Sequence, residues 1–297
     1  MKRPAPMPWG RENCIVSAES ALAEQPRCRQ PLSIRAVWAG VQHLTIDGRT
    51  VAVDEDGYLI LNELRECAVH GQCDRPAHAV AIFFRPGFAD EVFGSELTAL
   101  DHMLERDGEA ACRPFAFAEH LRPHDRIVTP VLRYISYHMD HGVDDEGWYE
   151  EQLRFLLQRM LQSHRLTLDA IQRLPSARGT TRREVYRRIG RATDFIHTCY
   201  ARELSIDDLA AAANISKYHF VRLFHAVHGT TPYAFLQAKR ARVARRLLET
   251  SDAGLDQIAA EAGFDNRVTL FRHLQRVAGC SGRALRKGAP ARIEQSA

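Results

Sequence analysis

Two arginines in the C-terminal third of the chain, Arg222 and Arg272, stand at matching positions of two similar segments. A guanidinium can donate two parallel hydrogen bonds to the edge of guanine, or it can clamp a phosphate. Each arginine falls on the outer stripe of a predicted helix, opposite the apolar stripe. A solvated face would explain one such helix, but the same pattern in two helices favours contact with DNA.

The elements around Arg222 follow the order helix, tight turn, helix. Ser205 and Asp208 form a predicted capping box that begins a short helix over 206–213, and Ser216 caps a second helix that runs to about His228. This spacing is typical of a helix-turn-helix. The apolar residues predicted to face the core are Phe220, Leu223, Phe224 and Val227. The predicted DNA-contacting residues are Lys217, Tyr218, Val221 and Arg222, with Ser216 as a phosphate contact.

The pattern then repeats. Thr231-Pro232 is predicted to begin a long helix that reaches about Glu249 and spans about 27 Å. A short helix over 255–261 and a last helix over 266–278 follow. With its flanking turns, the long helix can separate two recognition helices by about one DNA turn, ~34 Å. The predicted contacts in this second unit are Arg267, Val268, Phe271 and Arg272, with Asn266 as a phosphate contact.

Lys239 and Arg240 lie on the long helix and have two open interpretations. They can contact DNA phosphates, or they can form ion pairs within the protein. The formal charge leaves both possible, because residues 182–297 hold 20 Lys and Arg against 11 Asp and Glu. The rest of the chain is net acidic, so one end is suited to a polyanion and the other is not.

Short strands separated by turns are predicted in the first half. Segments 33–38, 41–46, 50–53, 58–61 and 79–84 are rich in Val, Ile and aromatic residues, and turn sequences such as Asp47-Gly48 and Asp56-Gly57 divide them. The predicted fold class is α+β with two domains: an N-terminal antiparallel barrel or sandwich with helices, and a C-terminal all-α domain with two helix-turn-helix units. A helix is also possible around Ser95–Arg106.

The expected domain limits follow from these patterns. Residues 1–31 are predicted to be a flexible arm, 32–174 a sensing or dimerisation domain, 175–182 a linker, 183–288 the DNA-binding domain and 289–297 a tail. An apolar stripe within Trp148–Leu166 has two interpretations, packing within its own domain or pairing with a second subunit. A homodimer is the expected assembly.

Other residues could also do chemistry, but their patterns give weaker evidence for a functional site. Cys67, His70 and Cys73 have a spacing that can hold a soft metal ion or form a redox pair, although ordinary half-buried cysteines are the simpler interpretation. Phe83, Phe84, Phe88 and Phe93, around Arg85, can line an effector pocket or form core. We find no phosphate-binding glycine loop, nucleophile motif or metal-ligand set, so we expect no enzyme, no cofactor and no metal site.

The C-terminal region resembles the DNA-binding domain of the AraC/XylS family. The matching residues include Leu209-Ala210, Ser216, Phe220, Gly229 to Pro232, Ile258-Ala259, Gly263-Phe264 and Arg286. The resemblance covers about 100 residues and implies recognition of double-stranded DNA by the outer positions of both recognition helices. It also implies an effector-binding or dimerising cupin-like N-terminal domain, activation of transcription and RNA polymerase as a partner. Leu274 and Gly282 depart from the family, which usually has Phe and Pro there, so docking of the second unit is less secure.

Alternatives to this activator are a repressor or architectural DNA-binding protein without an effector, and a regulator that responds to metal or thiol oxidation through Cys67, His70 and Cys73. No run of residues approaches the ~18 apolar positions of a membrane span. Seven scattered cysteines do not form a framework of disulfides. We therefore expect a cytoplasmic protein with no membrane contact.

Overall fold

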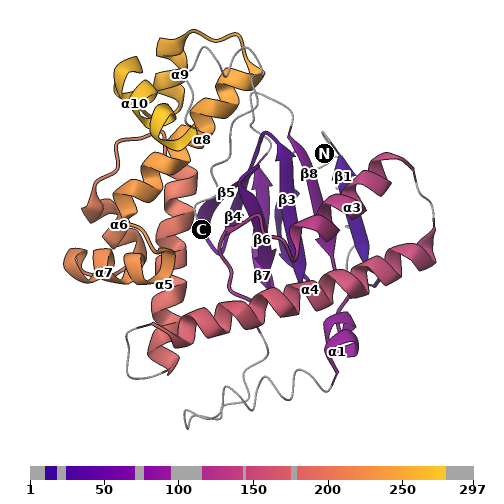
Figure 1. Ribbon diagram of the computed structural model, residues 1–297. Coiled ribbons are helices and arrows are strands. Elements are labelled where there is room, and N and C mark those ends of the chain that lie inside the picture. The colour runs from indigo at the N-terminus through magenta and orange to yellow at the C-terminus, as the bar shows by residue number, and fades with distance from the viewer. Residues whose placement is uncertain are drawn as a thin grey trace. The chain divides into compact units, whose positions relative to one another are not determined.

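The computed structural model describes residues 11–18, 25–70, 77–94, 116–142, 145–174 and 179–278 (Figure 1). The chain forms two compact units, Met1–Gly190 and Arg191–Ala297. Antiparallel sheets with helices make up the first, and the described part of the second is helical. This confirms the predicted α+β class. No helix among the described residues is both long and apolar enough to cross a membrane.

The N-terminal unit contains two antiparallel sheets. The five-stranded sheet has the order β1-β8-β3-β6-β9. Its strands are β1 (Cys14–Ala18), β8 (His78–Phe83), β3 (Ser33–Ala39), β6 (Gly57–Leu61) and β9 (Arg122–Pro123). The four-stranded sheet has the order β2-β7-β4-β5. Its strands are β2 (Gln25–Gln30), β7 (Arg65–His70), β4 (Val41–Ile46) and β5 (Arg49–Asp54).

The five-stranded sheet is buried on both faces, because successive side chains of a strand point to opposite sides. On β3, Val37 faces the four-stranded sheet and joins a core that includes Leu44, Val53 and Cys67. Ile34 and Ala36, on the other face of the strand, join a second core with the helices. The two sheets therefore form a sandwich, and helices cover one of its outer faces.

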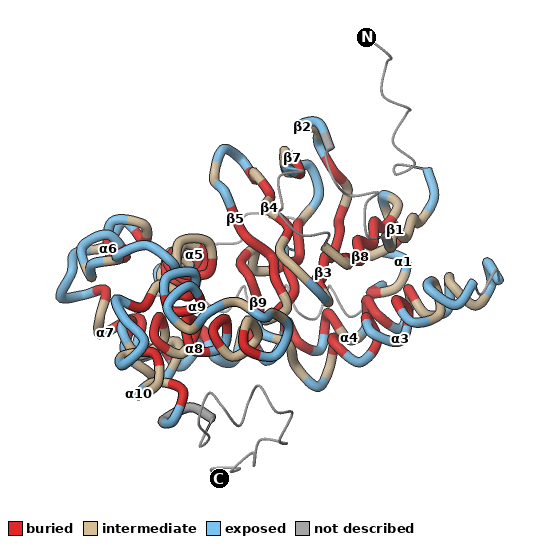
Figure 2. The backbone as a smooth tube through the Cα atoms, turned by 90° about the horizontal axis from the view of Figure 1, so that it is seen from above, coloured by how far each residue is buried: buried red, intermediate tan, exposed pale blue. Residues whose placement is uncertain are grey.

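Three helices supply that cover: α1 (Phe88–Phe93), α3 (Thr129–Asp140) and α4 (Glu146–Gln172). Figure 1 shows α3 and α4 running across the sheets, and Figure 2 shows buried positions through β3 and β8. The apolar stripe predicted within Trp148–Leu166 lies in this core, with Leu156, Leu157 and Met160 fully buried. The stripe packs within its own unit, so it does not supply a surface for a second subunit.

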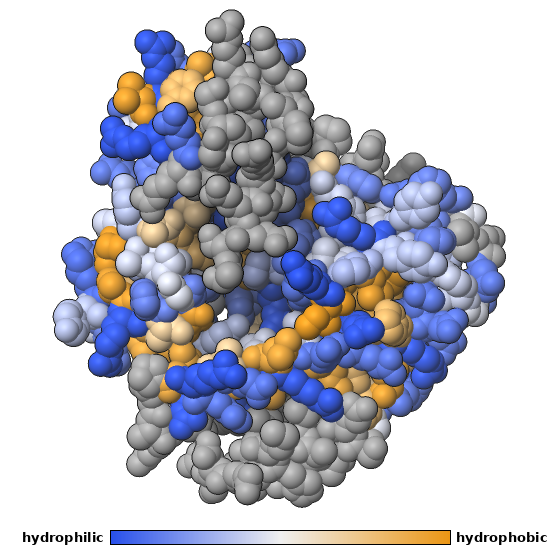
Figure 3. All heavy atoms as spheres, in the orientation of Figure 1, coloured by the Kyte–Doolittle hydropathy of each residue, from blue (hydrophilic) through white to orange (hydrophobic). Residues whose placement is uncertain are grey.

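The outer side of α4 still presents some apolar surface. Figure 3 shows hydrophobic residues among hydrophilic ones on this side of the molecule, and Leu166 and Phe155 of α4 are 55% and 39% exposed. The four phenylalanines predicted either to line a pocket or to form core are buried to at least 98%. Arg85 lies over the Phe88 ring and forms an ion pair with Glu91 at 2.6 Å. The core interpretation therefore holds for these residues.

The predicted flexible arm over 1–31 is wrong for its described part. β1 pairs with β8 from Cys14 opposite Phe83 to Ala18 opposite Ala79, and β2 pairs with β7. Neither segment has a strong strand pattern of its own, so the partner strands supply the order.

The predicted strands of residues 33–84 agree with β3, β4, β5, β6 and β8. The structure adds β7, which the sequence pattern does not predict. The possible helix at Ser95–Arg106 lies outside the described residues.

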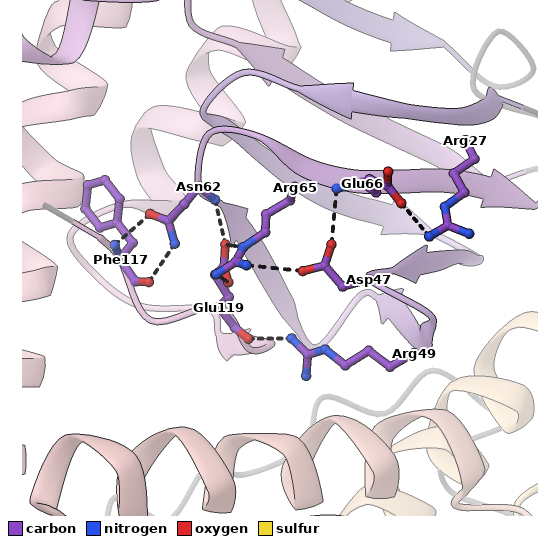
Figure 4. Close-up of polar contacts among 8 residues, drawn as sticks. All are labelled: Arg27, Asp47, Arg49, Asn62, Arg65, Glu66, Phe117 and Glu119. Atoms are coloured by element: carbon purple, nitrogen blue, oxygen red, sulfur yellow. Dashed lines mark hydrogen bonds and ion pairs between the residues drawn. The ribbon is translucent and has the colours of Figure 1, made fainter. Parts of the chain in front are cut away.

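A polar network fastens a loop to the turns of the sandwich (Figure 4). The Asn62 side-chain amide donates to the Phe117 carbonyl at 2.9 Å, and its oxygen accepts from the Phe117 amide at 2.8 Å. Glu119 accepts from the Asn62 amide and pairs with Arg65, which also reaches Asp47. These bonds hold residues 117–119 beside the β4–β5 and β6–β7 turns, where strand pairing alone does not reach.

Helix α4 contains a buried histidine. His164 of α4 packs edge-on against the Phe117 ring, with 5.4 Å between ring centroids. Burial, assisted by the guanidinium of Arg122, lowers the pKa of His164 to about 3. The folded protein therefore keeps this imidazole neutral.

This histidine predicts acid sensitivity of the N-terminal unit. The unfolded chain, with an ordinary histidine pKa of about 6.5, binds a proton that the folded chain does not bind. The free energy of unfolding should therefore fall as the pH drops below about 6.5, by about 2 kcal/mol near pH 5 from His164 alone. Urea unfolding followed by tryptophan fluorescence measures this unit, because Trp9, Trp38 and Trp148 all belong to it. His164→Leu should flatten the acid slope, and the exposed control His141→Gln should keep it. An unchanged slope in His164→Leu would contradict the assignment.

The C-terminal unit is built from four shorter helices and one long one, α8, among the described residues. They are α6 (Ile206–Ala213), α7 (Lys217–His228), α8 (Pro232–Thr250), α9 (Leu255–Glu261) and α10 (Arg267–Ala278). They follow α5 (Gly179–Cys199), and the division between the two units falls inside α5, after Gly190. The predicted linker over 175–182 therefore differs from the structure at its end, since α5 already begins at Gly179.

Candidate nucleic-acid interface

The first helix-turn-helix consists of α6 and α7. Both hydrogen bonds of the predicted capping box are present: the Ser205 hydroxyl accepts from the Asp208 amide, and the Asp208 carboxylate accepts from the Ser205 amide. Asn214 ends α6 in the left-handed conformation, with φ of 51°. This conformation turns the chain sharply so that Ser216 can begin α7.

Helix α7 has a buried face and an exposed one. Phe220, Leu223 and Phe224 are buried, as predicted, and Val227 is half-buried. On the other side Tyr218 is 87% exposed, Arg222 is exposed and Val221 is half-buried. The structure therefore presents a tyrosine and a guanidinium beside one another on a helix that its apolar face fixes in place.

The second helix-turn-helix consists of α9 and α10, and α8 connects it to the first. The Thr231 hydroxyl accepts from the Ala234 amide and caps α8, with Pro232 in the first turn as predicted. The chain turns after α9 at Gly263, with φ of +81°. Asn266 caps α10, because its side-chain oxygen accepts from the Thr269 amide at 2.9 Å. Leu270 and Leu274 of α10 join Leu248 and Ile258 in one core.

Helix α10 repeats the pattern of α7. Arg267 and Arg272 are exposed, Val268 is 61% exposed, and Phe271 is half-buried. Both recognition helices thus present exposed arginine beside apolar or aromatic surface. Arginine suits guanine or phosphate, and apolar atoms suit the methyl group of thymine.

The residues that begin the two helices differ in their hydrogen bonding. Ser216 makes no side-chain capping bond, so its hydroxyl does not serve the α7 terminus. The Asn266 oxygen is used as a cap, which leaves its amide nitrogen as the group that can face a phosphate. Lys217 forms an exposed ion pair with Asp207 at 2.7 Å. Such a pair contributes little stability, so a phosphate can replace Asp207 at low cost.

Lys239 and Arg240 point into the protein, in place of the expected phosphate contact. Lys239 is fully buried, with its ammonium over the Tyr200 ring. The Arg240 guanidinium donates to the carbonyls of Tyr200 and Arg202 at 2.8 and 2.7 Å. These bonds fasten α8 to the segment after α5. The structure therefore favours the intramolecular alternative, with backbone carbonyls and an aromatic ring among the partners.

One candidate residue was missed by the sequence analysis. His219 is exposed on α7, and its Nε2 lies 3.1 Å from Nη2 of Arg222. The three-residue spacing between them was the available signal, since such positions are neighbours on a helix. His219 can orient the guanidinium before DNA arrives.

The predicted cluster of Cys67, His70 and Cys73 does not assemble among the described residues. Cys67 is buried inside the sandwich, whereas His70 is exposed, and its Nε2 lies 2.6 Å from the Thr45 hydroxyl. Residues at odd spacing along a strand point to opposite faces, so these two cannot share a metal ion. Cys73 lies outside the described residues.

Two helix-turn-helix units, each with an exposed cationic recognition face, define a DNA-binding domain. Comparison with known proteins agrees. Residues 209–288 match the family model described as "Helix-turn-helix domain", and the C-terminal region is of the AraC type.

Relatives are similar over this region. The MmsAB operon regulatory protein of Pseudomonas aeruginosa is 32% identical over 99 residues, which are 32% of each chain. The HTH-type transcriptional regulator ExsA of Pseudomonas aeruginosa is 29% identical over 102 residues, 34% of this chain and 37% of that protein. The chain thus covers about a third of the length of these curated relatives. The DNA-binding domain of AdpA, solved with a target DNA, is 32% identical and covers 36% of this chain and 97% of that one, with a TM-score of 0.32.

Proposed function

We propose that this protein is a transcription regulator whose α7 and α10 read two adjacent major-groove segments of double-stranded DNA. The observation that carries the proposal is the repetition of one exposed face. Arg222 with Tyr218, and Arg272 with Val268, stand outward on helices whose opposite sides are buried. A protein that needs these helices only for packing has no reason to repeat an arginine on both outer faces.

The length and packing of α8 also fit the proposal that α7 and α10 bind two adjacent major-groove segments. This helix has 19 residues, and at 1.5 Å per residue it is about 28 Å long. It packs against α6 and α7 and also against α9 and α10. A rigid connector of this length suits two recognition helices that enter successive turns of one groove, ~34 Å apart. The buried Lys239 and Arg240 serve this rigidity.

The N-terminal unit is proposed to sense a small-molecule effector. The Ser33 hydroxyl and the Gln42 side-chain oxygen are buried without hydrogen-bond partners among the described residues. By strand alternation both side chains share a face with core residues of the sandwich interior, Val37 for Ser33 and Leu44 for Gln42. Unpaired buried polar atoms are costly, and a bound ligand would satisfy them. The proposal includes a homodimer, activation of transcription and contact with RNA polymerase, on the strength of the AraC-type domain.

The test is fluorescence anisotropy of the full chain on the DNA upstream of its own gene, against a scrambled duplex, over a salt series. We expect selective binding whose affinity falls steeply with salt, because phosphate contacts release counterions. Equal binding to both duplexes at every salt concentration would overturn specific reading of this DNA. A metabolite panel added to the same assay tests the effector. A regulator without an effector would keep its affinity throughout.

A further inference from the structure

Two cysteines that are far apart in the sequence face one another across β2 and β7. Cys28 and Cys67 are direct partners in the antiparallel register, which runs on through Arg29 opposite Glu66 and Gln30 opposite Arg65 and shifts between Gln25 and Cys28. Direct partners in an antiparallel pair have Cα atoms roughly 4.5–5.5 Å apart and point to the same face. A disulfide needs Cα atoms about 4.4–6.8 Å apart, so the backbone already lies within range.

The shared face is the interior of the sandwich. Cys67 is fully buried in the core between the sheets, and Cys28 is half-buried on β2, the edge strand. Arg27 and Glu66 form an ion pair between the same two strands (Figure 4), and the Leu64 amide donates to the Gln30 carbonyl at 2.9 Å. Contacts on both sides of Cys28 therefore hold the register that aligns the thiols.

A buried cation lies beside this pair. Arg35 of β3 is 1% exposed, and its guanidinium lies over the Phe83 ring, 5.1 Å from the centroid. It donates to the Gln30 side-chain oxygen at 2.9 Å, while Nε and Nη1 have no hydrogen-bond partner. The thiols of Cys67 and Cys28 lie close enough to act electrostatically on this guanidinium when they ionise. The Gln30 amide also donates weakly to the Cys28 sulfur, at 3.9 Å.

A buried guanidinium is costly unless an anion accompanies it. Thiolates are the anions that these neighbours can provide. Burial raises the pKa of the Cys67 thiol, and the Arg35 guanidinium opposes that rise. The same positive charge makes a metal ion unfavourable at these sulfurs. The surroundings therefore disfavour metal binding by this pair of thiols, which leaves oxidation to a disulfide as the chemistry open to them.

We propose that Cys28 and Cys67 form a reversible cross-strand disulfide when a two-electron oxidant such as hydrogen peroxide is present, with Arg35 as the residue whose positive charge stabilises the Cys67 thiolate. The modification requires no DNA, so it stands apart from the proposed function. It would tie the edge strand β2 covalently to β7.

The reaction balances in two steps. The half-buried Cys28 thiolate attacks one peroxide oxygen, the O–O bond breaks, and Cys28 sulfenic acid forms with hydroxide, which takes up the proton released by the thiol. The Cys67 sulfur then attacks the sulfenic sulfur, the S–S bond forms, the S–O bond breaks, and water leaves with the Cys67 proton. Two thiols are oxidised to one disulfide, one peroxide is reduced, and two waters result. An external dithiol then reduces the disulfide by thiol–disulfide exchange, which restores both thiols and leaves the dithiol oxidised.

Peptide mapping of the full chain tests the bond. A Cys73→Ser background is needed, because trypsin leaves Cys67 and Cys73 on one peptide, whereas Cys28 emerges on a dipeptide with Arg29. After peroxide treatment and alkylation, we expect the peptide with Cys67 to carry this dipeptide as the main disulfide product, and dithiothreitol to remove it. Free, alkylated Cys28 and Cys67 while other thiols are oxidised, or pairing of Cys67 with a different cysteine, would overturn the proposal.

The role of Arg35 needs its own readout. Arg35→Gln should slow formation of the bond between roughly three- and tenfold, because loss of the charge lowers the thiolate fraction of Cys67, the sulfur that closes the disulfide. Arg35→Lys keeps the charge and should restore most of the rate. Equal rates in all three proteins would overturn the role of Arg35. The tryptophan fluorescence of each variant reports whether the unit is folded, and the wild-type mapping decides the bond if either variant is not.

Discussion

Replacing Arg222 with alanine is expected to weaken binding to the operator by about 1–3 kcal/mol, the usual cost of losing an arginine contact to guanine. The side chain is exposed on α7, and its described partner is His219, so the fold does not depend on it. Anisotropy on specific and scrambled DNA measures the change. Arg245→Ala is a matched control, because that arginine pairs with Glu249 on α8, at 2.8 Å. It should leave the specific affinity nearly unchanged.

Arg272→Ala makes the corresponding test of α10. If both helices read bases, the two losses should be similar and should add in the double variant, because distant sites act independently. If Arg222→Ala weakens operator binding and Arg272→Ala does not, the second helix-turn-helix only positions the first. Full affinity and selectivity in the double variant would refute DNA reading by these two faces.

Gly263→Ala is expected to destabilise the second helix-turn-helix by about 2–4 kcal/mol. The backbone there has φ of +81°, which costs an L-residue about 1–2 kcal/mol. An added Cβ would also lie 2.7 Å from the Tyr200 carbonyl oxygen and 2.8 Å from Cα of Ala201, so the turn after α9 would have to move. The same junction holds Arg240, whose Nε would be 3.0 Å from the new atom.

The matched control is Gly229→Ala at the end of α7. Its φ is +68°, but an added Cβ meets nothing within 4 Å, so only the conformational cost of about 1–2 kcal/mol applies. Hydrogen exchange measured on peptides from α9 and α10 reports the local loss without requiring the whole chain to unfold together. Faster exchange there in Gly263→Ala than in Gly229→Ala is the expected result. Equal exchange would show that the turn accommodates a side chain.

The sequence alone determined most of the C-terminal unit. The α7 stripe, the Ser205 box and the Thr231 cap are local patterns, and each appears in the structure as predicted. Helical order follows from contacts between residues three or four positions apart, so neighbouring residues carry the information. The outward positions of Arg222 and Arg272 come from the same periodicity.

Tertiary structure decided what depends on distant partners. Strands β1 and β2 have weak patterns and are ordered by β8 and β7, so their sequences by themselves predict an arm. The sequence leaves Lys239 and Arg240 open to phosphate contact or to partners within the protein, and only the fold places them against the carbonyls and ring at Tyr200–Arg202. Cys28 and Cys67 become partners only through register, because strand pairing joins residues that no sequence spacing relates.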